Sequence, residues 1–241
     1  MKGVTFGTKH SYKDWGLILK SRPEISPPNP KTVYIDIPAS DGSLDLTESL
    51  TGDVKFENRK IKFEFTVIDI RKKWSSIYSE ILNYLHGQSM KIILDEDADY
   101  YYFGRIRVNE WKSSKRTSTI TIEAVVEPYK YEICSSIEDW LWDTFNFETG
   151  VIRDYRDIRV DGAINYILHC NRKKVVPKFI VTLDEEGTDF QIRWNGGDWR
   201  TYIVRESGTY TFPNIKLVQG DQNIYFDGKG SVSIDYRGGS L

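Results

Sequence analysis

Alternation of apolar and polar side chains is clearest between Lys60 and Val67. Ile61, Phe63, Phe65 and Val67 share one parity, and polar residues occupy the other. Successive side chains of a strand point to opposite faces. The pattern therefore predicts a strand with one buried face and one face open to water or to a partner.

A helical spacing of apolar residues follows, from Trp74 to His86. Its members are Trp74, Ile77, Tyr78, Ile81, Leu82 and Leu85. Gly87 stands where a glycine often ends a helix. The spacing predicts one amphipathic helix with its aromatic stripe packed on the core. The short basic run before it, Arg71 to Lys73, is interpreted as a solvated face.

Further strands are expected around turns that follow the helix. Residues 91–94 and 100–103 flank the acidic turn from Asp95 to Asp99 and predict a hairpin. Residues 104–111 and 117–126 predict a second hairpin. The inward set of its last strand is Ile120, Ile122, Ala124 and Val126.

A proline-rich stretch from Ser21 to Pro38 excludes helix and favours extended chain. Residues 32–37 within it alternate weakly and predict a strand. The polar segment that follows, residues 39–48, is predicted to be an exposed arm or loop.

A domain boundary is expected near Tyr131 to Cys134, which gives domains 1–131 and 132–241. Beyond it, short apolar runs alternate with turn signals at Asp161-Gly162, Asn195-Gly196-Gly197 and Asp227-Gly228. That density of turns predicts a β-sandwich.

Composition narrows the classes of function. The chain has 241 residues, a net charge of -2 and 14% aromatic residues. The charge gives no basic surface for nucleic acid, so no specific nucleic-acid binding is expected. No window approaches the ~20 apolar residues of a membrane span, and none resembles a signal peptide. Synthesis and assembly in the cytosol follow as an expectation, with Cys134 and Cys170 as buried thiols.

Candidate chemistry is sparse. Asp95, Asp97 and Asp99 open like a calcium loop, but Tyr100 and Ile106 replace the glycine and carboxylate that such a loop requires. The three histidines, His10, His86 and His169, are widely separated; His86 suits the carbonyl end of the predicted helix. Hydrolase, metalloprotease and nucleotide-binding motifs are missing. We therefore expect no catalytic residue, no metal, no cofactor and no enzymatic activity.

The aromatic residues Trp194, Trp199 and Tyr202 allow two interpretations. Such rings stack on sugars in some β-sandwiches, but a tryptophan in this fold class is more often part of the core. The core interpretation is favoured.

Several short motifs, in order along the first 131 residues, resemble the distal tail proteins (Dit) of long, non-contractile-tailed bacteriophages. The motifs are residues 7–17, GTKHSYKDWGL; 42–48, GSLDLTE; 56–59, FENR; 85–88, LHGQ; 97–105, DADYYYFGR; and 127–131, EPYKY. Residues 142–148 and 234–239 resemble the family's C-terminal domain less specifically.

The resemblance implies a mainly β protein. Its N-terminal β-sandwich-like domain would carry one α-helix and an extended arm, and its C-terminal β-sandwich would be galectin-like or carbohydrate-module-like. It implies a virion structural protein at the distal end of the phage tail. Six copies would form a ring joining the tail tube protein to the tail-associated tip protein and, in many phages, to a receptor-binding protein. The family has no catalytic residues to transfer.

The candidate ring interface is the polar arm. Its residues are Asp41, Gly42, Ser43, Leu44, Asp45, Leu46, Thr47 and Glu48. The alternative function is a carbohydrate-binding module that attaches to host surface glycans, with Trp194 and Trp199 as stacking residues. A tail lysin, the third class, is disfavoured by the missing catalytic motifs.

Overall fold

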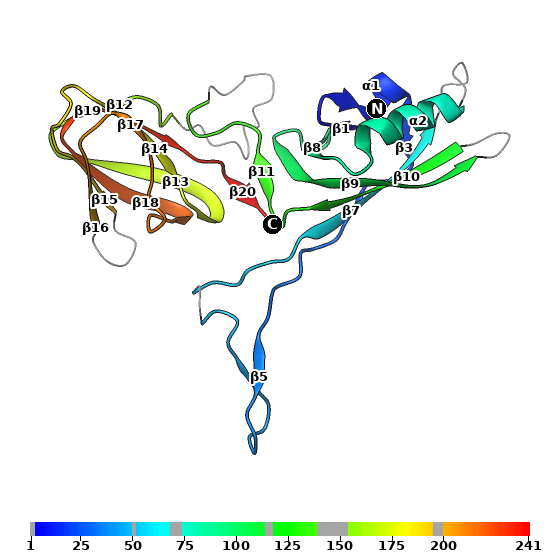
Figure 1. Ribbon diagram of the computed structural model, residues 1–241, viewed down its shortest axis with the longest axis horizontal. Coiled ribbons are helices and arrows are strands. Elements are labelled where there is room, and N and C mark those ends of the chain that lie inside the picture. The colour runs from blue at the N-terminus through cyan, green and yellow to red at the C-terminus, as the bar shows by residue number, and fades with distance from the viewer. Residues whose placement is uncertain (1–2, 50–51, 68–73, 114–117, 139–153, 195–199) are drawn as a thin grey trace. The chain divides into compact units, whose positions relative to one another are not determined.

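The computed structural model describes residues 3–49, 52–67, 74–113, 118–138, 154–194 and 200–241. The chain divides into two compact units, Met1–Lys130 with Leu241, and Tyr131–Ser240. Strands dominate both units, as the sequence predicts, and the described residues include only two helices (Figure 1).

One large sheet forms the first unit. Its strands in spatial order are β2 (Lys9–His10), β1 (Val4–Phe6), β8 (Ser89–Leu94), β9 (Tyr100–Ser113), β10 (Ser118–Val126), β7 (Arg59–Val67) and β3 (Leu17–Leu19), and β4 (Glu24–Ile25) also pairs with β7. The predicted inward residues of β7 and β10 are confirmed: Ile61, Phe63, Phe65, Ile120, Ile122, Ala124 and Val126 are buried, and Val67 packs partly buried against them.

The sheet curls strongly on itself. Strands β1 and β7 are four steps apart in the sheet, which would separate them by roughly 19 Å if the sheet were flat. Yet the ring centroids of Phe6 on β1 and Phe63 on β7 lie 5.4 Å apart, edge to face. The two ends of the sheet therefore face each other across one core, which gives the unit its sandwich-like character.

The predicted helix is α2 (Trp74–Leu85). Ile77, Ile81 and Leu85 are buried in the core of the sheet, and Gly87 just beyond the helix has a φ of +76°. His86 accepts a hydrogen bond at Nδ1 from the Val108 amide, at 3.2 Å. This bond ties the residue just beyond the helix to strand β9. The basic run at residues 71–73 lies outside the described residues.

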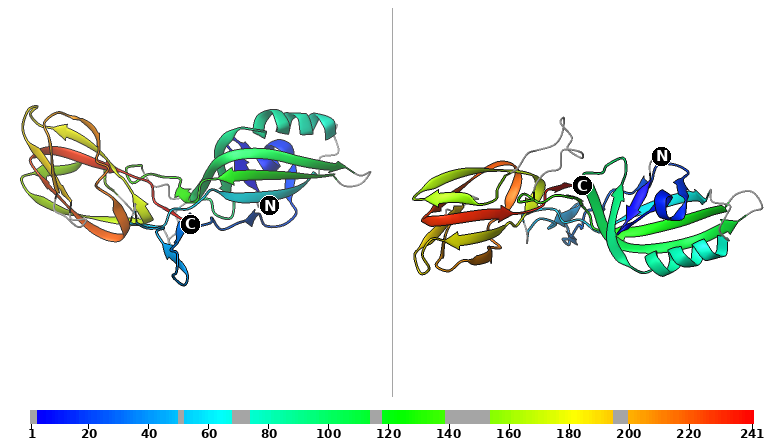
Figure 2. Two further views of the ribbon diagram at one scale, coloured as in Figure 1. Left: turned by 60° about the horizontal axis from the view of Figure 1, so that its bottom comes forward. Right: turned by 90° about the horizontal axis from the view of Figure 1, so that it is seen from above.

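The two predicted hairpins share one strand. Strand β9 runs unbroken over 14 residues and pairs first with β8 and then along β10. Figure 2 shows α2 along one side of these strands. The side chains on their other side are uncovered by helix in the described part of the unit.

The second unit is a β-sandwich, as the turn signals predict. One sheet has the order β12 (Ile158–Asp161), β19 (Lys229–Asp235), β14 (Lys178–Leu183) and β17 (Gly208–Thr211); the other has β13 (Ile164–Val175), β18 (Leu217–Asp227), β15 (Phe190–Trp194) and β16 (Arg200–Val204). Phe179 and Phe226, one from each sheet, meet with ring centroids 6.5 Å apart. Cys134 and Cys170 are not joined in a disulfide; Cys170 is buried, as expected, and Cys134 is half-buried. A short ribbon of β11 (Lys130–Glu132) and β20 (Gly239–Ser240) completes the strands near the chain end.

Candidate assembly arm and sheet groove

A two-stranded ribbon interrupts the chain between β4 and β7. Strand β5 (Tyr34–Asp36) pairs antiparallel with β6 (Ser43–Asp45), and Tyr34 lies opposite Asp45. Every residue of both strands is exposed, so neither face of this ribbon packs on the rest of the chain. Residues 32–48 are called the arm below.

The two legs leading to the ribbon are also paired through their backbones. The Leu46 amide donates to the Val33 carbonyl at 2.8 Å, and the Lys31 amide donates to the Lys55 carbonyl at 2.7 Å. Prolines on the first leg hold it extended and cannot continue a sheet on both sides. The sequence therefore favours an extended hairpin here in place of a further strand of the sheet.

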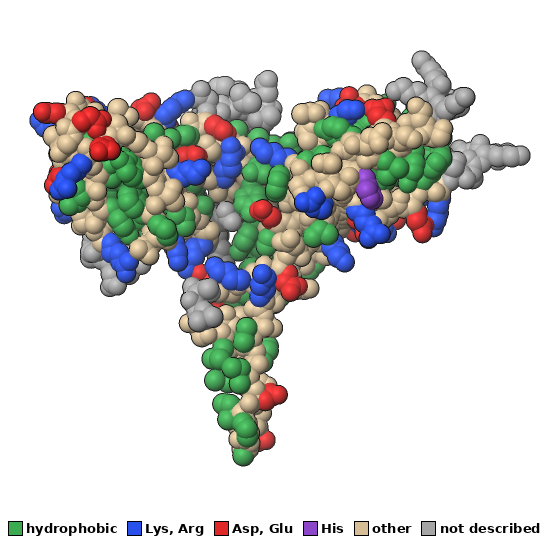
Figure 3. All heavy atoms as spheres, in the orientation of Figure 1, with side chains coloured by type: hydrophobic (Ala, Val, Ile, Leu, Met, Phe, Trp, Pro, Cys, Tyr) green, Lys and Arg blue, Asp and Glu red, His purple; other side chains and the backbone are tan. Residues whose placement is uncertain are grey.

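Apolar side chains cover much of the arm without a core beneath them. Val33, Tyr34, Ile35, Ile37 and Leu44 are 46–59% exposed, and Figure 3 shows hydrophobic side chains gathered along the hairpin. A lone two-stranded ribbon is marginally stable in water. An exposed cluster of large apolar residues commonly marks an interaction surface.

The arm is also acidic. From Thr32 to Val54 the sequence contains five acidic residues and no Lys or Arg. Asp36, Asp41, Asp45 and Glu48 form no ion pair with any residue that the structure describes. Hydrogen bonds from the Thr47 hydroxyl and amide, the latter 2.9 Å long, lower the pKa of the Asp45 carboxyl.

A hollow in the surface lies on the side of β9 and β10 that no described helix covers. A hollow of about 600 Å³ is lined by Asn58, His86, Gly87, Ser89, Phe103, Gly104, Arg105, Ile106, Arg107, Val125 and Glu127. We call it the sheet groove. Phe103 and Val125 are 37% and 46% exposed within it, and the Arg105 and Arg107 side chains are exposed on the same strand face.

The cations of this face differ in their partners. Lys62 on β7 is paired with Glu64 at 2.9 Å, and that hydrogen bond holds the pKa of the Glu64 carboxyl below its usual value. Arg105 donates to the Gly87 carbonyl. Arg107 lies opposite Glu123 in register, but its side chain forms no hydrogen bond or ion pair within the described residues. Neither arginine forms an ion pair with a carboxylate among the described residues, and one carboxylate, that of Glu127, also lines the groove.

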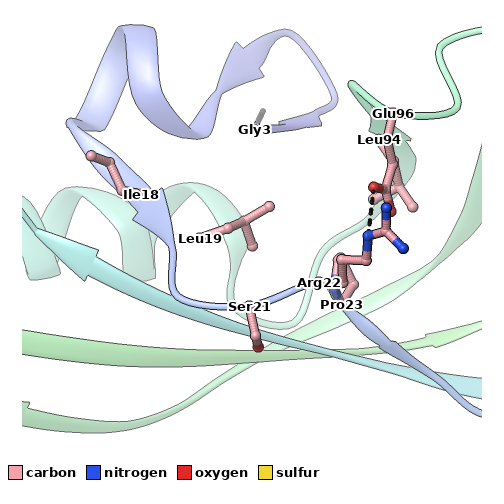
Figure 4. A pocket seen from close by; sticks show the side chains of 8 residues that line it. All are labelled: Gly3, Ile18, Leu19, Ser21, Arg22, Pro23, Leu94 and Glu96. Atoms are coloured by element: carbon pink, nitrogen blue, oxygen red, sulfur yellow. Dashed lines mark ion pairs between the residues drawn. The ribbon is translucent and has the colours of Figure 1, made fainter. Parts of the chain in front are cut away.

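A second, smaller hollow of about 340 Å³ lies elsewhere in the first unit, between the start of β1 and the segment after β3. Figure 4 shows Leu19 and Leu94 beside it and Arg22 reaching Glu96. That ion pair is 3.5 Å long, and the Arg22 side chain is 84% exposed. Its charges are already matched, unlike those of the sheet groove.

Comparison with known proteins bears on the fold. The Dit protein of phage SPP1, described as a paradigm of the hub adsorption apparatus in phages that infect Gram-positive bacteria, matches over 100% of both chains with a TM-score of 0.66 and 10% identity. The chain has the Dit fold. The activated, calcium-bound baseplate of phage P2 matches at a TM-score of 0.35 and 10% identity, over 100% of this chain and 98% of that one. No family model and no curated protein gives a significant sequence match.

Within this Dit fold, the arm residues expected at a ring interface fall at and beside the tip of the ribbon. Ser43, Leu44 and Asp45 form β6, while Asp41 and Gly42 precede it in the turn. Leu46 and Thr47 are half-buried and Glu48 is exposed. The sheet groove was not predicted from the sequence, because its two exposed apolar residues, Phe103 and Val125, come from different strands.

The stacking residues of the glycan alternative are not available as a pair. Trp194 on β15 is 5% exposed and belongs to the sandwich core, as the core interpretation expects. A ring in that position cannot stack on a sugar. Trp199 lies outside the described residues. Tyr202 packs half-buried against Phe212, with ring centroids 4.3 Å apart.

The acidic turn that mimics a calcium loop uses its carboxylates internally. Asp95 accepts a hydrogen bond from the Gly3 amide at 2.6 Å, and Asp97 pairs with Lys130 at 2.6 Å. Burial and the nearby Asp97 raise the pKa of the Asp99 carboxyl. Among the described residues, no group of three or more His, Cys, Asp or Glu side chains could hold a metal ion.

His10 has a structural role that the sequence did not reveal. Its Nδ1 accepts hydrogen bonds from the Tyr12 and Lys13 amides, and so caps the start of α1 (Ser11–Trp15). Its Nε2 lies 3.1 Å from Asp95. Neither described helix has the length and apolar character to cross a membrane.

Proposed function

We propose that this chain is a structural, non-enzymatic hub of a phage tail tip. Six copies form a ring at the distal end of the tail, which joins the tail tube protein to the tail-associated tip protein and to a receptor-binding protein. The observation that carries the proposal is the Dit fold over the whole chain. The SPP1 protein that shares this fold is described as part of a hub adsorption apparatus.

The arm supports the ring in particular. Closed cyclic assemblies are built from head-to-tail interfaces, in which one surface of a subunit meets a different surface of the next. An exposed apolar ribbon with unpaired carboxylates is suited to be one of those two surfaces. The first unit, Met1–Lys130, then forms the ring and the sandwich is a docking or spacer domain.

Antibody labelling tests the assigned location. An antibody raised against the purified chain should decorate virions of the encoding phage at the distal end of the tail and nowhere else. Labelling of the head or the tail shaft would overturn the proposal. The glycan-binding alternative is tested by a glycan array with the full chain, on which we expect no reproducible binding. Binding that is lost in Trp199→Ala would favour the alternative.

A further inference from the structure

One charged side chain of the first unit is buried without a counter-ion. Arg59, the first residue of β7, is only 6% exposed. Its Nε and Nη2 atoms are enclosed and have no hydrogen-bond partner, and no described carboxylate forms an ion pair with it. We propose that the Arg59 guanidinium is the centre of a binding site for a small oxyanion, of the phosphate or carboxylate class. This inference does not depend on the proposed ring.

The charge of Arg59 is the first argument. Within the described residues, the other enclosed side-chain atoms without a partner are the indole nitrogens of Trp74 and Trp111 and the hydroxyl of Tyr202. Those three groups are neutral, whereas an arginine side chain stays protonated in a protein. Burial lowers the pKa of the Arg59 guanidinium, because removal from water disfavours its charged form. A buried charge is costly unless it is paired, so this one calls for a bound ion.

The side chains around Arg59 do not neutralise it. Its guanidinium carbon lies 4.9 Å from the centre of the Tyr102 ring on β9. Such a cation–π contact offsets only part of the cost of taking a charge out of water. The nearest carboxylate that acts on this pair, Asp97, is bound to Lys130 at 2.6 Å, and Lys130 lies 4.2 Å from the centre of the Tyr100 ring. That carboxylate is therefore already engaged.

Tyr102 adds a neutral donor beside the charge. Burial, and to a smaller extent the charge of Asp97, raises the pKa of the Tyr102 phenol. Its hydroxyl therefore stays protonated at neutral pH and can donate a hydrogen bond. The Tyr102 hydroxyl and Nη1 of Arg59 form no hydrogen bond in the described structure, and both retain some exposed surface. Two open donors on a stacked pair that carries a positive charge favour a ligand with negative oxygen acceptors.

The site lies where the chain returning from the arm enters the sheet. Arg59 is opposite Val126, the last residue of β10, and just before it the Glu57 amide donates to the Asn29 carbonyl at 2.8 Å. The unfolded chain does not hold the donors of Arg59 and Tyr102 together. A bound oxyanion therefore stabilises the folded first unit by mass action, through neutralisation of its buried charge.

Thermal unfolding of the full chain at neutral pH tests the site. Sodium phosphate and sodium acetate are titrated separately, with sodium chloride at equal ionic strength as the reference. The wild-type midpoint should rise above the reference by about 2–4 °C with at least one oxyanion and then saturate. Arg59→Met removes the charge and should abolish this rise. Arg159→Met is the matched control, because Arg159 is an exposed arginine already bound to Asp184 at 2.7 and 2.6 Å; it should keep the wild-type response.

The two titrations also identify the source of the oxyanion. A saturable response to phosphate supports a free inorganic anion, and a response to acetate alone supports a carboxylate such as a protein side chain carries. Arg59→Lys serves if Arg59→Met does not fold, and it should need a several-fold higher concentration for half of the rise, because lysine lacks the planar set of donors.

Phosphate also strengthens apolar burial in proteins generally, so the comparison of variants decides. The site is overturned if neither oxyanion raises the wild-type midpoint above the chloride reference. It is also overturned if Arg59→Met, or Arg59→Lys in its place, responds at the same concentrations and to the same extent as the wild type.

Discussion

Gly104 of β9 and the carbonyl oxygen of Val125 on β10 are so close that a Cβ at position 104 would overlap that oxygen. A larger residue would force the two strands apart at the sheet groove. Gly104→Ala should therefore lower the free energy of unfolding by about 1–3 kcal/mol, the usual cost of overpacking. Gly208→Ala is the control, because a Cβ there meets only ordinary ring contacts of Tyr210 at 3.6 Å. Equal denaturation midpoints for the two variants would contradict the close approach.

The helix supplies a second prediction. Ile81 of α2 is fully buried in the core of the first unit. Ile81→Ala should cost about 2–5 kcal/mol through lost burial and a residual cavity. Ser79→Ala on the exposed side of the same helix should change stability little. Urea denaturation measures both, and an unchanged midpoint for Ile81→Ala would show that the helix is not packed as described.

Capping by His10 gives a third prediction. His10→Ala removes the acceptor of two backbone amides at the start of α1 and should cost about 0.5–2 kcal/mol. His10→Asn should recover part of that loss, because asparagine is also a good N-cap residue. If urea denaturation shows His10→Asn to be no more stable than His10→Ala, a capping role is contradicted.

The elements that the sequence predicts correctly are those in which the local spacing of apolar and polar residues shows which face is buried. The alternation in β7 and the helical spacing in α2 follow from one buried face each. The sequence pattern predicted a break between two hairpins at Gly104, but the glycine lies inside one strand, where it permits close packing against Val125. His10 is an uncommon N-cap residue, so composition gave no signal for it.

The candidate site could not be predicted from the sequence where it depends on the pairing of strands far apart in the chain. Arg105 and Val125 form one surface only because β9 and β10 pair in that register, and nothing local to either residue specifies it. The arm was predicted as an exposed polar segment. Its pairing of Tyr34 with Asp45, and the acidic apolar surface that results, depended on the fold.

Acidification should weaken the proposed arm contact. An aspartate side chain in an unfolded chain has a pKa of about 3.9. Asp45 keeps its charge to a lower pH than an ordinary aspartate, because Thr47 lowers its pKa. The hydrogen bonds from Thr47 to the ionised Asp45 carboxylate therefore stabilise the folded arm fully above the unfolded pKa of about 3.9. This stabilisation is lost as the pH falls through the pKa of Asp45 in the folded chain. We expect the oligomer fraction, measured by light scattering, to fall as pH drops through this range while circular dichroism stays unchanged. Full assembly at pH 3 in the folded protein would refute the electrostatic contribution.

The ring is the central claim, and the mass of the full chain in solution tests it most directly. Mass photometry should give a species of six times the mass of one chain. Removal of Asp41 to Glu48 should leave each unit folded and shift the sample toward single chains. A full chain that remains monomeric at every accessible concentration, or an unchanged oligomer after the deletion, would contradict the account.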